Sequence, residues 1–280
     1  MNTVAIVGVG LIGGSFALAL RAAGFRGRIL GVSSPRTLDA AAGLGVIDEG
    51  LPLEAAVPAA DLIYLANPIA RILEVLPAVA LLARPGSLTT DAGSTKSAIV
   101  ARASVLFTGD ALFLGGHPLA GKAERGVEAA EATLFGGAPY VLTPASGDLP
   151  GHPAAAEFHA WLQRLGARVL ILTPDEHDRA VAFTSHLPQL ASTALASVIL
   201  ENTFPGDRAI SGGGLRDMTR LAESAYELWR DICLTNTDNL DRALQLYIQK
   251  LEHLRQNLRE RELEREFNRA AELPGGLSRP

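Results

Sequence analysis

Short apolar runs alternate with longer amphipathic stretches over the first 174 residues of the chain. The runs have the length and composition of buried strands, whereas the stretches between them favour helices. Strands that alternate with helices require crossover connections, so this pattern predicts a mostly parallel sheet covered by helices. The expected strands cover residues 3–8, 28–32, 62–66, 87–92, 112–116, 139–144 and 167–174.

The strand pattern stops after Pro174, and the remaining residues read as helix interrupted by one glycine-rich loop at 211–217. The run 177–200 is apolar around most of its circumference, which predicts burial in a helical core or in a subunit interface. Pro188 should kink or interrupt this run. In the last long helix, large apolar residues alternate at spacings of four and three, which is typical of a coiled-coil seam. They are Leu240, Leu244, Tyr247, Leu251, Leu254 and Leu258. The seam fits packing on its own domain or on a second subunit.

Composition narrows the partners that the chain can have. A formal net charge of −5 without a basic stripe gives no electrostatic footprint for nucleic acid or an anionic membrane, so a small-molecule partner is expected. Cys233 is the single cysteine, which fits a reducing compartment and predicts the cytoplasm. The uncharged run over residues 3–20 contains four glycines, which suit a turn better than a membrane helix.

Three glycines follow the first expected strand with the spacing G-x-G-x-x-G, at Gly8, Gly10 and Gly13. Between a strand and a helix, this spacing indicates a loop that holds the pyrophosphate of a dinucleotide. Gly8 permits the tight turn, Gly10 lets the backbone approach the phosphates, and Gly13 allows the helix to pack closely on the strand. We therefore expect a Rossmann-type α/β dinucleotide-binding domain over residues 1–174 and an all-helical domain over 175–280.

The second expected strand ends without the acidic residue that would hold the ribose hydroxyls of NAD. Ser33 and Ser34 stand there, followed by Arg36. Hydroxyls and a guanidinium can bind a 2′-phosphate that a carboxylate would repel, so the sequence favours NADP over NAD. The alternative is that Ser34 and Arg36 are ordinary turn residues. The residues expected to contact the cofactor are Gly8, Gly10, Leu11, Ile12, Gly13, Ser33, Ser34, Arg36, Asn67 and Pro68.

Three further positions carry candidate chemistry. His117, in "GGHPLAG", lies at the carboxyl end of an expected strand, the edge where open α/β sheets bind ligands, or else is a structural histidine. Ser94, in "DAGSTKS", precedes a helix and either caps it or hydrogen-bonds a substrate. Arg216 lies in the glycine-rich loop and is either an anion-binding group or an ordinary surface arginine. No metal site is expected.

In seven segments, from about residue 3 to residue 255, the chain resembles the prephenate and arogenate dehydrogenases of tyrosine biosynthesis. The segments are "VGVGLIGGS", "DAGSTKSAI", "GGHPLAG", "LFGGAPYVLTP", "EHDRAVAFTSHLPQ", "GGLRDMTRLA" and "ELWRDICLTN". The resemblance implies an oxidative decarboxylation, in which a cyclohexadienol loses a hydride to NADP or NAD and carbon dioxide from its ring, leaving a phenol. It also implies that the helical domain binds substrate and forms a homodimer.

The resemblance assigns roles that the chemistry supports. Hydride departure builds positive charge at the carbinol carbon, so a base must take the hydroxyl proton, and His117 would be that base. Ser94 would hydrogen-bond the same hydroxyl or the imidazole. Arg216 would pair with a substrate carboxylate, and which of the two carboxylates stays open. His186 would lie in the substrate pocket. Many members read His-Leu-Pro-His where this chain has Gln189, so the choice between prephenate and arogenate stays open.

Three other functions compete with this interpretation. A β-hydroxyacid dehydrogenase relies on a lysine in its helical domain, and here that domain holds only Lys250, in a charged terminal helix. A hydrolase built on Ser94 and His117 would need a G-x-S-x-G nucleophile elbow, which the sequence lacks. A dinucleotide-sensing regulator would need a module that reads DNA or binds a partner protein, and the sequence shows none.

Overall fold

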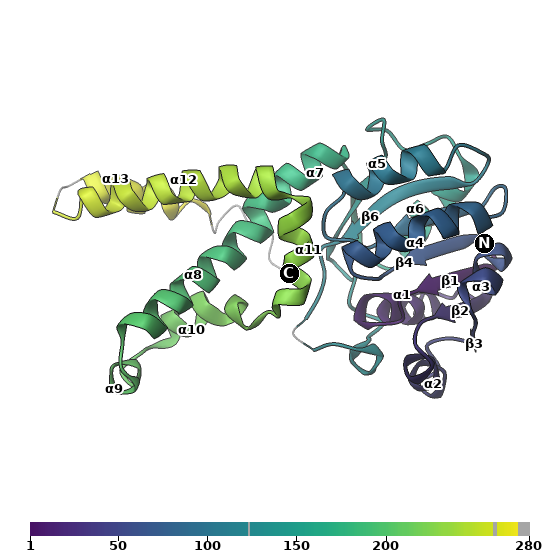
Figure 1. The fold of residues 1–280 in the computed structure, drawn as a ribbon, viewed down its shortest axis with the longest axis horizontal. Coiled ribbons are helices and arrows are strands. Elements are labelled where there is room, and N and C mark those ends of the chain that lie inside the picture. Colours follow the sequence, from purple (N-terminus) through teal and green to yellow (C-terminus); the bar gives the residue numbers. More distant parts are fainter. Residues whose placement is uncertain (123, 260–261, 274–280) are drawn as a thin grey trace. The chain divides into compact units, whose positions relative to one another are not determined.

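The computed structural model describes residues 1–122, 124–259 and 262–273 (Figure 1). Its contacts divide the chain into two compact units. The first combines Met1–Ala180 with Ser224–Thr235, and the second combines Val181–Glu223 with Asn236–Pro280. The chain leaves the first unit at Ala180 and returns to it for one segment, Ser224–Thr235, and the expected domain boundary at Pro174 stays a prediction.

The first unit is built on one eight-stranded sheet with the order β3-β2-β1-β4-β5-β6-β7-β8. Every pairing is parallel except that between β6 and β7, as the pattern predicted for a mostly parallel sheet. Only β3 was not expected, because two exposed residues leave no apolar pattern. The strands are β1 (Thr3–Val7), β2 (Arg28–Val32), β3 (Glu49–Gly50), β4 (Leu62–Leu65), β5 (Leu88–Asp91), β6 (Leu112–Pro118), β7 (Pro139–Thr143) and β8 (Arg168–Ile171).

Alternate residues of each central strand bury themselves on opposite faces of the sheet, as the strand repeat requires. In β1, Val4 and Ile6 join one apolar cluster and Ala5 and Val7 join the other. The first cluster takes in residues of α1 (Leu11–Ala22), α2 (Pro35–Gly43) and α6 (Pro153–Arg164). The second takes in residues of α3 (Leu53–Ala59), α4 (Ile69–Leu82) and α5 (Ser97–Leu106). The unit is therefore a sheet between two layers of helices (Figure 1).

Two helices beyond residue 174 complete the first unit, which explains why the division differs from the expected one. The first is α7 (Pro174–Val181) and the second is α11 (Tyr226–Thr235). In α11, Ile232 is buried in the cluster beneath α4, and the Asp231 carboxylate accepts a hydrogen bond of 3.0 Å from the amide of Ala70 in the first turn of α4. A carboxylate at a helix N-terminus satisfies amides that have no partner within the helix. A hydrophobicity pattern does not reveal this long-range cap.

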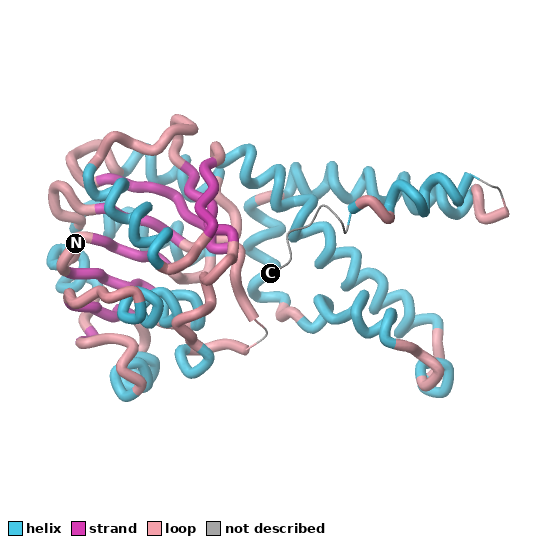
Figure 2. Tube along the Cα trace, turned by 180° about the vertical axis from the view of Figure 1, so that it is seen from behind, coloured by secondary structure: helices cyan, strands magenta, loops and turns pink. Residues whose placement is uncertain are grey.

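The described elements of the second unit are helices joined by loops (Figure 2). The expected break near Pro188 is confirmed, because a π-helical turn, η2, precedes the proline. Pro188 itself lies in the first turn of the next helix, where its missing amide hydrogen costs nothing. The elements are η2 (Ala182–His186), α8 (Leu187–Asn202), α9 (Pro205–Arg208), α10 (Gly213–Thr219), η3 (Arg220–Glu223), α12 (Thr237–Gln256) and α13 (Glu262–Ala270).

One expectation about the second unit is wrong, and another stays a prediction. The glycine-rich segment is not a loop throughout, because α10 starts at Gly213 and packs on α8. The run 177–200 is partly exposed in the described chain, where Val198 is 57% and Leu200 is 64% exposed, so the alternative of burial in a subunit interface stays a prediction. The seam of α12 behaves likewise: Leu240 is buried and Leu251 is exposed.

No helix in the described part of the chain combines the length and the apolar character that a membrane span requires.

Candidate active site

The loop between β1 and α1 has the backbone that a phosphate cradle needs. Gly8 has φ +97°, and a Cβ there would lie 2.8 Å from the backbone of Ala66. A Cβ on Gly13 would lie 2.2 Å from the Gly8 carbonyl oxygen, so both positions require glycine. Gly10 is different, because a Cβ there would meet open space. It is the N-cap of α1 and no side chain caps it, so the amides of the first turn remain available to an anion.

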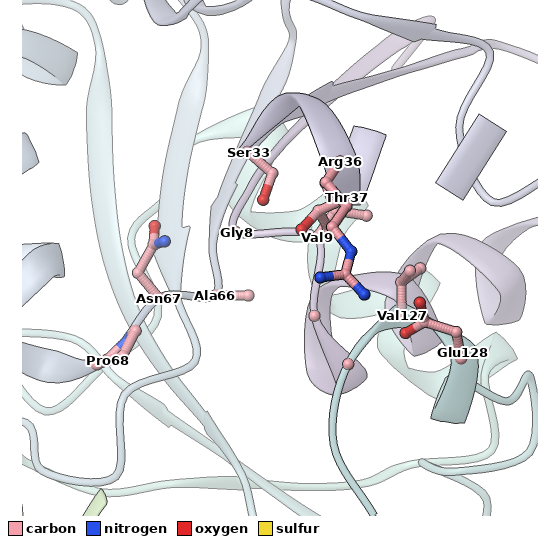
Figure 3. A pocket seen from close by; sticks show the side chains of 12 residues that line it. Gly8, Val9, Ser33, Arg36, Thr37, Ala66, Asn67, Pro68, Val127 and Glu128 are labelled. Carbon is pink, nitrogen blue, oxygen red and sulfur yellow. The ribbon is translucent and has the colours of Figure 1, made fainter. Parts of the chain in front are cut away.

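A cavity of about 470 Å³ opens beside this loop (Figure 3). It lies at the carboxyl ends of β1, β2 and β4, where the strand order reverses between β1 and β4, which is where open α/β sheets bind ligands. Its lining residues are Gly8, Val9, Gly10, Ser33, Arg36, Thr37, Ala66, Asn67, Pro68, Gly126, Val127 and Glu128.

The residues of this cavity fit a dinucleotide. The Oδ1 atom of Asn67 is buried and has no hydrogen-bond partner among the described residues, so it is ready to accept a hydrogen bond from a ligand. A bound dinucleotide would place its phosphates at the start of α1 and its adenosine ribose near Ser33 and Arg36.

Most of the predicted cofactor residues line the cavity, but some do not. Leu11, Ile12 and Gly13 begin α1 and are not among the lining residues. Ser34 is the N-cap of α2, and its hydroxyl accepts a hydrogen bond of 3.3 Å from the amide of Thr37. This geometry matches the alternative reading of Ser34 as a turn residue, so its contact with the cofactor stays a prediction. Residues 126–128 also line the cavity, and no motif in the sequence indicated them.

His117 is held at the end of a hydrogen-bonded chain. It is 7% exposed and lies at the carboxyl end of β6. Its Nδ1 atom lies 2.8 Å from Nε2 of His177, and Nδ1 of His177 lies 2.8 Å from Oδ1 of Asp178. His177 and Asp178 are both buried near the middle of α7.

The Asp178 carboxylate also caps α5. Its two oxygens accept hydrogen bonds from the amides of Lys96, at 2.7 Å, and Ser97, at 2.8 Å. Burial alone would raise the pKa of Asp178, but the hydrogen bonds from His177, Ser97 and Lys96 outweigh it and leave the pKa below its ordinary value. Asp178 is therefore ionised at neutral pH, and it ties the histidine chain to the start of α5.

Ser94 lies in the loop between β5 and α5 and is partly buried. The N-cap of α5 is Lys96, and the capping acceptor is Asp178, so the alternative that Ser94 caps this helix is wrong. Because β5 and β6 are parallel neighbours, Ser94 and His117 follow the same edge of the sheet on adjacent strands.

A buried ion pair supports the strand that carries His117. Lys96 and Asp91 are both fully buried and bonded to each other. Lys96 Nζ donates to the carbonyl oxygen of Gly116 at 2.8 Å, and Asp91 Oδ1 accepts from the amide of Gly116 at 3.2 Å. Burial lowers the pKa of Lys96, and the neighbouring Asp91 opposes this effect. The pair fixes both backbone groups of the residue next to His117.

The other predicted residues belong to the second unit. Arg216 is exposed on α10 and forms no ion pair with a described residue. His186 is buried, with its Nδ1 atom 3.3 Å from Nδ2 of Asn236. Gln189 is buried and donates from Nε2 to the carbonyl oxygen of Leu221 at 2.7 Å.

Comparison with known proteins identifies the family. The model of the prephenate dehydrogenase nucleotide-binding domain matches residues 16–171, and that of the prephenate dehydrogenase dimerization domain matches residues 173–271. The chain belongs to the prephenate dehydrogenase family. It is an NAD(P)-dependent oxidoreductase of tyrosine biosynthesis, and membership decides against the β-hydroxyacid dehydrogenase, hydrolase and regulator alternatives.

Several known proteins align with this prephenate dehydrogenase family member over almost its whole length. A prephenate dehydrogenase of Lactococcus lactis is 36% identical over 93% of this chain and 70% of its own length. The prephenate dehydrogenase of Aquifex aeolicus, solved with hydroxyphenyl propionate and NAD+, is 31% identical over 98% of this chain and 96% of its own, with a TM-score of 0.86. The arogenate dehydrogenase of Synechocystis is 34% identical over 98% of each chain, with a TM-score of 0.79.

Four residues of the site in this dehydrogenase show no functional signal in the sequence pattern, namely Asp91, Lys96, His177 and Asp178. The segment "EHD" that begins α7 reads as an ordinary polar helix start, because acidic residues favour that position. The lysine in "DAGSTKS" reads as a surface residue for a similar reason, since lysine is almost never fully buried unless paired. Their burial depends on contacts between segments far apart in the chain, which the sequence pattern does not contain.

Proposed function

We propose that the enzyme converts prephenate to 4-hydroxyphenylpyruvate and carbon dioxide, with NADP as the preferred cofactor. The observation that carries the proposal is His117 in its hydrogen-bonded chain, at the same sheet edge as the dinucleotide cavity. The A. aeolicus relative supports it, because its ligands are NAD+ and a phenol with a three-carbon acid side chain.

The residues at the strand ends perform the proton transfer. When bound, the nicotinamide accepts the hydride from the carbinol carbon of the substrate. His117 takes the hydroxyl proton as that hydride leaves, which prevents positive charge from building up at the carbon. Ser94 hydrogen-bonds the same hydroxyl and holds it toward the imidazole. When carbon dioxide leaves, the electron pair of the broken carbon–carbon bond enters the ring. The ring becomes aromatic and the former carbonyl oxygen becomes a phenolate. His117 then returns the proton to this oxygen.

The helical unit holds the acidic groups of the substrate. Arg216 pairs with a substrate carboxylate, which its planar guanidinium can bind through two hydrogen bonds. His186 is buried in the same unit, with its Nδ1 atom 3.3 Å from the amide nitrogen of Asn236, and it contacts the substrate in this proposal.

Arogenate is the second candidate substrate, and Gln189 favours it. The amide nitrogen of Gln189 donates to Leu221 at 2.7 Å and to the hydroxyl of Thr193 at 3.3 Å. Because these bonds engage its amide hydrogens, Gln189 can contact a substrate only through its oxygen, which accepts from an ammonium and cannot donate to a keto group.

A cross of two substrates with two cofactors tests the proposed function. We expect the purified enzyme to reduce NADP with prephenate at a kcat/KM at least about 10-fold above that for any other pairing, since discrimination by one charged contact has this size. Absorbance of the reduced cofactor gives the rate, and chromatography identifies the phenol product. Turnover of arogenate alone would replace prephenate with the second candidate, and absence of turnover with either substrate would end the proposal.

The preference for NADP rests on Arg36, whose guanidinium extends along the cavity wall (Figure 3). Ser33 also lines the cavity, and its hydroxyl can also bind a 2′-phosphate. Glu128 lies in the same cavity and opposes this preference, because its carboxylate would repel a nearby phosphate.

Replacing Arg36 by alanine should raise KM for NADP by about 10- to 100-fold, as expected for the loss of a charge-assisted hydrogen bond, and KM for NAD much less. Initial rates at saturating substrate measure both constants. Arg28→Ala is the matched control, because Arg28 pairs with Glu49 at the other end of β2. Equal changes in KM for NADP and NAD would refute the 2′-phosphate contact.

We also propose a homodimer formed through the helical domain, in the cytoplasm. The exposed apolar residues of α8 and α12, and the match to a dimerization domain, support the dimer. The single cysteine supports the reducing compartment.

A further inference from the structure

The hydrogen bonds around His177 determine where each proton lies. Asp178 accepts from two backbone amides, so its carboxylate is the acceptor in the bond with His177, and Nδ1 of His177 carries the proton. Nε2 of a neutral His177 is then an acceptor. It lies 2.8 Å from Nδ1 of His117, so that atom of His117 must donate. The chain of bonds thus leaves Nε2 of His117 as the basic nitrogen.

We propose that His177 and Asp178 are positioning residues for catalysis: they fix His117 in the Nδ1–H tautomer, aim its Nε2 atom at the substrate hydroxyl, and stabilise the imidazolium that forms. This inference rests on the proposed role of His117 as the base. It goes beyond that role because neither residue touches the substrate in the proposed reaction.

The surroundings of the chain support this role. His177 is fully buried and lies T-shaped against His117, with ring centroids 5.0 Å apart, so the second imidazole cannot turn without disturbing the first. Asp178 is ionised at neutral pH, because its hydrogen bonds hold its pKa below the ordinary value. Its fixed negative charge, two hydrogen bonds away, stabilises the imidazolium that forms when His117 takes the substrate proton. The Asp91–Lys96 pair beside Gly116 is unchanged in every variant described next.

Two substitutions of His177 separate positioning from packing. His177→Phe keeps a planar ring but removes the acceptor for His117 Nδ1. His177→Gln keeps an acceptor oxygen, although it cannot carry an imidazolium charge. We expect kcat to fall by about 10- to 100-fold in the Phe variant, as for other residues that orient a functional imidazole, with a smaller loss in the Gln variant. KM for the substrate should change by less than about 3-fold in both, because neither variant removes a substrate contact.

The pH profile supplies a readout that a packing defect would not move. In the Phe variant, the acid limb of kcat should shift to lower pH, because the protonated base loses its stabilising partners. Wild-type kcat with an unmoved acid limb in the Phe variant would overturn the proposal. Equal losses in the Phe and Gln variants with an unmoved acid limb would overturn it as well. The His117→Asn variant distinguishes the proposed base from the proposed positioning residues. Wild-type turnover in this variant would refute the role of His117 as the base. Loss of turnover in this variant, together with wild-type kcat and an unmoved acid limb in the His177→Phe variant, would refute only the role of His177 and Asp178.

Nitrogen-15 NMR of the histidine rings tests the tautomer without any turnover. With the signals assigned through His117→Asn and His177→Gln, neutral His117 in the wild-type enzyme should carry its proton on Nδ1. The Phe variant should move that proton to Nε2, the form that isolated imidazoles prefer. A wild-type signal with the proton on Nε2 would overturn the proposal.

Discussion

Replacing His117 by asparagine lowers kcat by about 10²–10⁴-fold, the range expected for loss of a general base, while NADP binding is retained. Asparagine keeps a polar group in the space near His177 but cannot accept the hydroxyl proton. His117 does not line the cofactor cavity, so the affinity of the variant enzyme for NADP should equal that of the wild type. Steady-state rates at saturating prephenate and fluorescence titration with NADPH measure the two effects.

His152→Asn is the matched control for this experiment. His152 is the N-cap of α6, where asparagine is an equally good cap, so this variant should keep wild-type turnover and stability. Wild-type turnover in the His117 variant would show that another group takes the hydroxyl proton.

Replacing Lys96 by methionine should lower the free energy of unfolding by about 3–5 kcal/mol, because it leaves the buried Asp91 carboxylate without its cation. The same change removes the donor to the Gly116 carbonyl oxygen. The end of β6 that carries His117 then shifts, and a displacement near 1 Å can lower kcat by about 100-fold. Urea denaturation gives the first quantity, and steady-state assays of the folded variant give the second.

Two further variants show whether the buried charge is the cause. Lys250→Met makes the same substitution in an ion pair whose lysine is 49% exposed, and it should change stability by less than about 1 kcal/mol. Asp91→Asn combined with Lys96→Met removes both charges and should recover part of the lost stability. Equal destabilisation by the Lys96 and Lys250 variants would contradict the account of the buried pair.

The fold of the first unit could be predicted because its sheet is buried on both faces. Such strands are continuous apolar runs, and Leu62–Leu65 is an example in which every residue is buried. The glycine cradle could be predicted for a different reason, since Gly8 and Gly13 meet backbone that excludes any side chain. Both signals are local in the sequence and need no knowledge of distant contacts.

The second unit was harder to predict, because apolar periodicity does not say what covers a helix. The pattern along α8 is the same whether the cover is another helix of the chain or a second subunit. Arg216 shows a related limit: three glycines in a row favour a loop, but packing of α10 on α8 overrides that preference.

The sequence indicated candidate site residues at the ends of strands, but not the buried groups that support them. His117 was found because its glycines and proline mark a strand end. His177 lies 60 positions away in sequence, and Asp178 lies 82 positions from the amide of Lys96 that it caps. Only the folded chain brings these groups together, so sequence spacing cannot reveal them.

A crystal structure of the enzyme with NADP and 4-hydroxyphenylpyruvate tests the central claim most directly. We expect the phenol oxygen of the product to lie about 2.6–3.2 Å from Nε2 of His117, which is the distance over which a base takes a proton. The nicotinamide ring should lie against the ring carbon that bears this oxygen. A phenol oxygen bound away from the His117 imidazole, with another group at that distance, would contradict the claim.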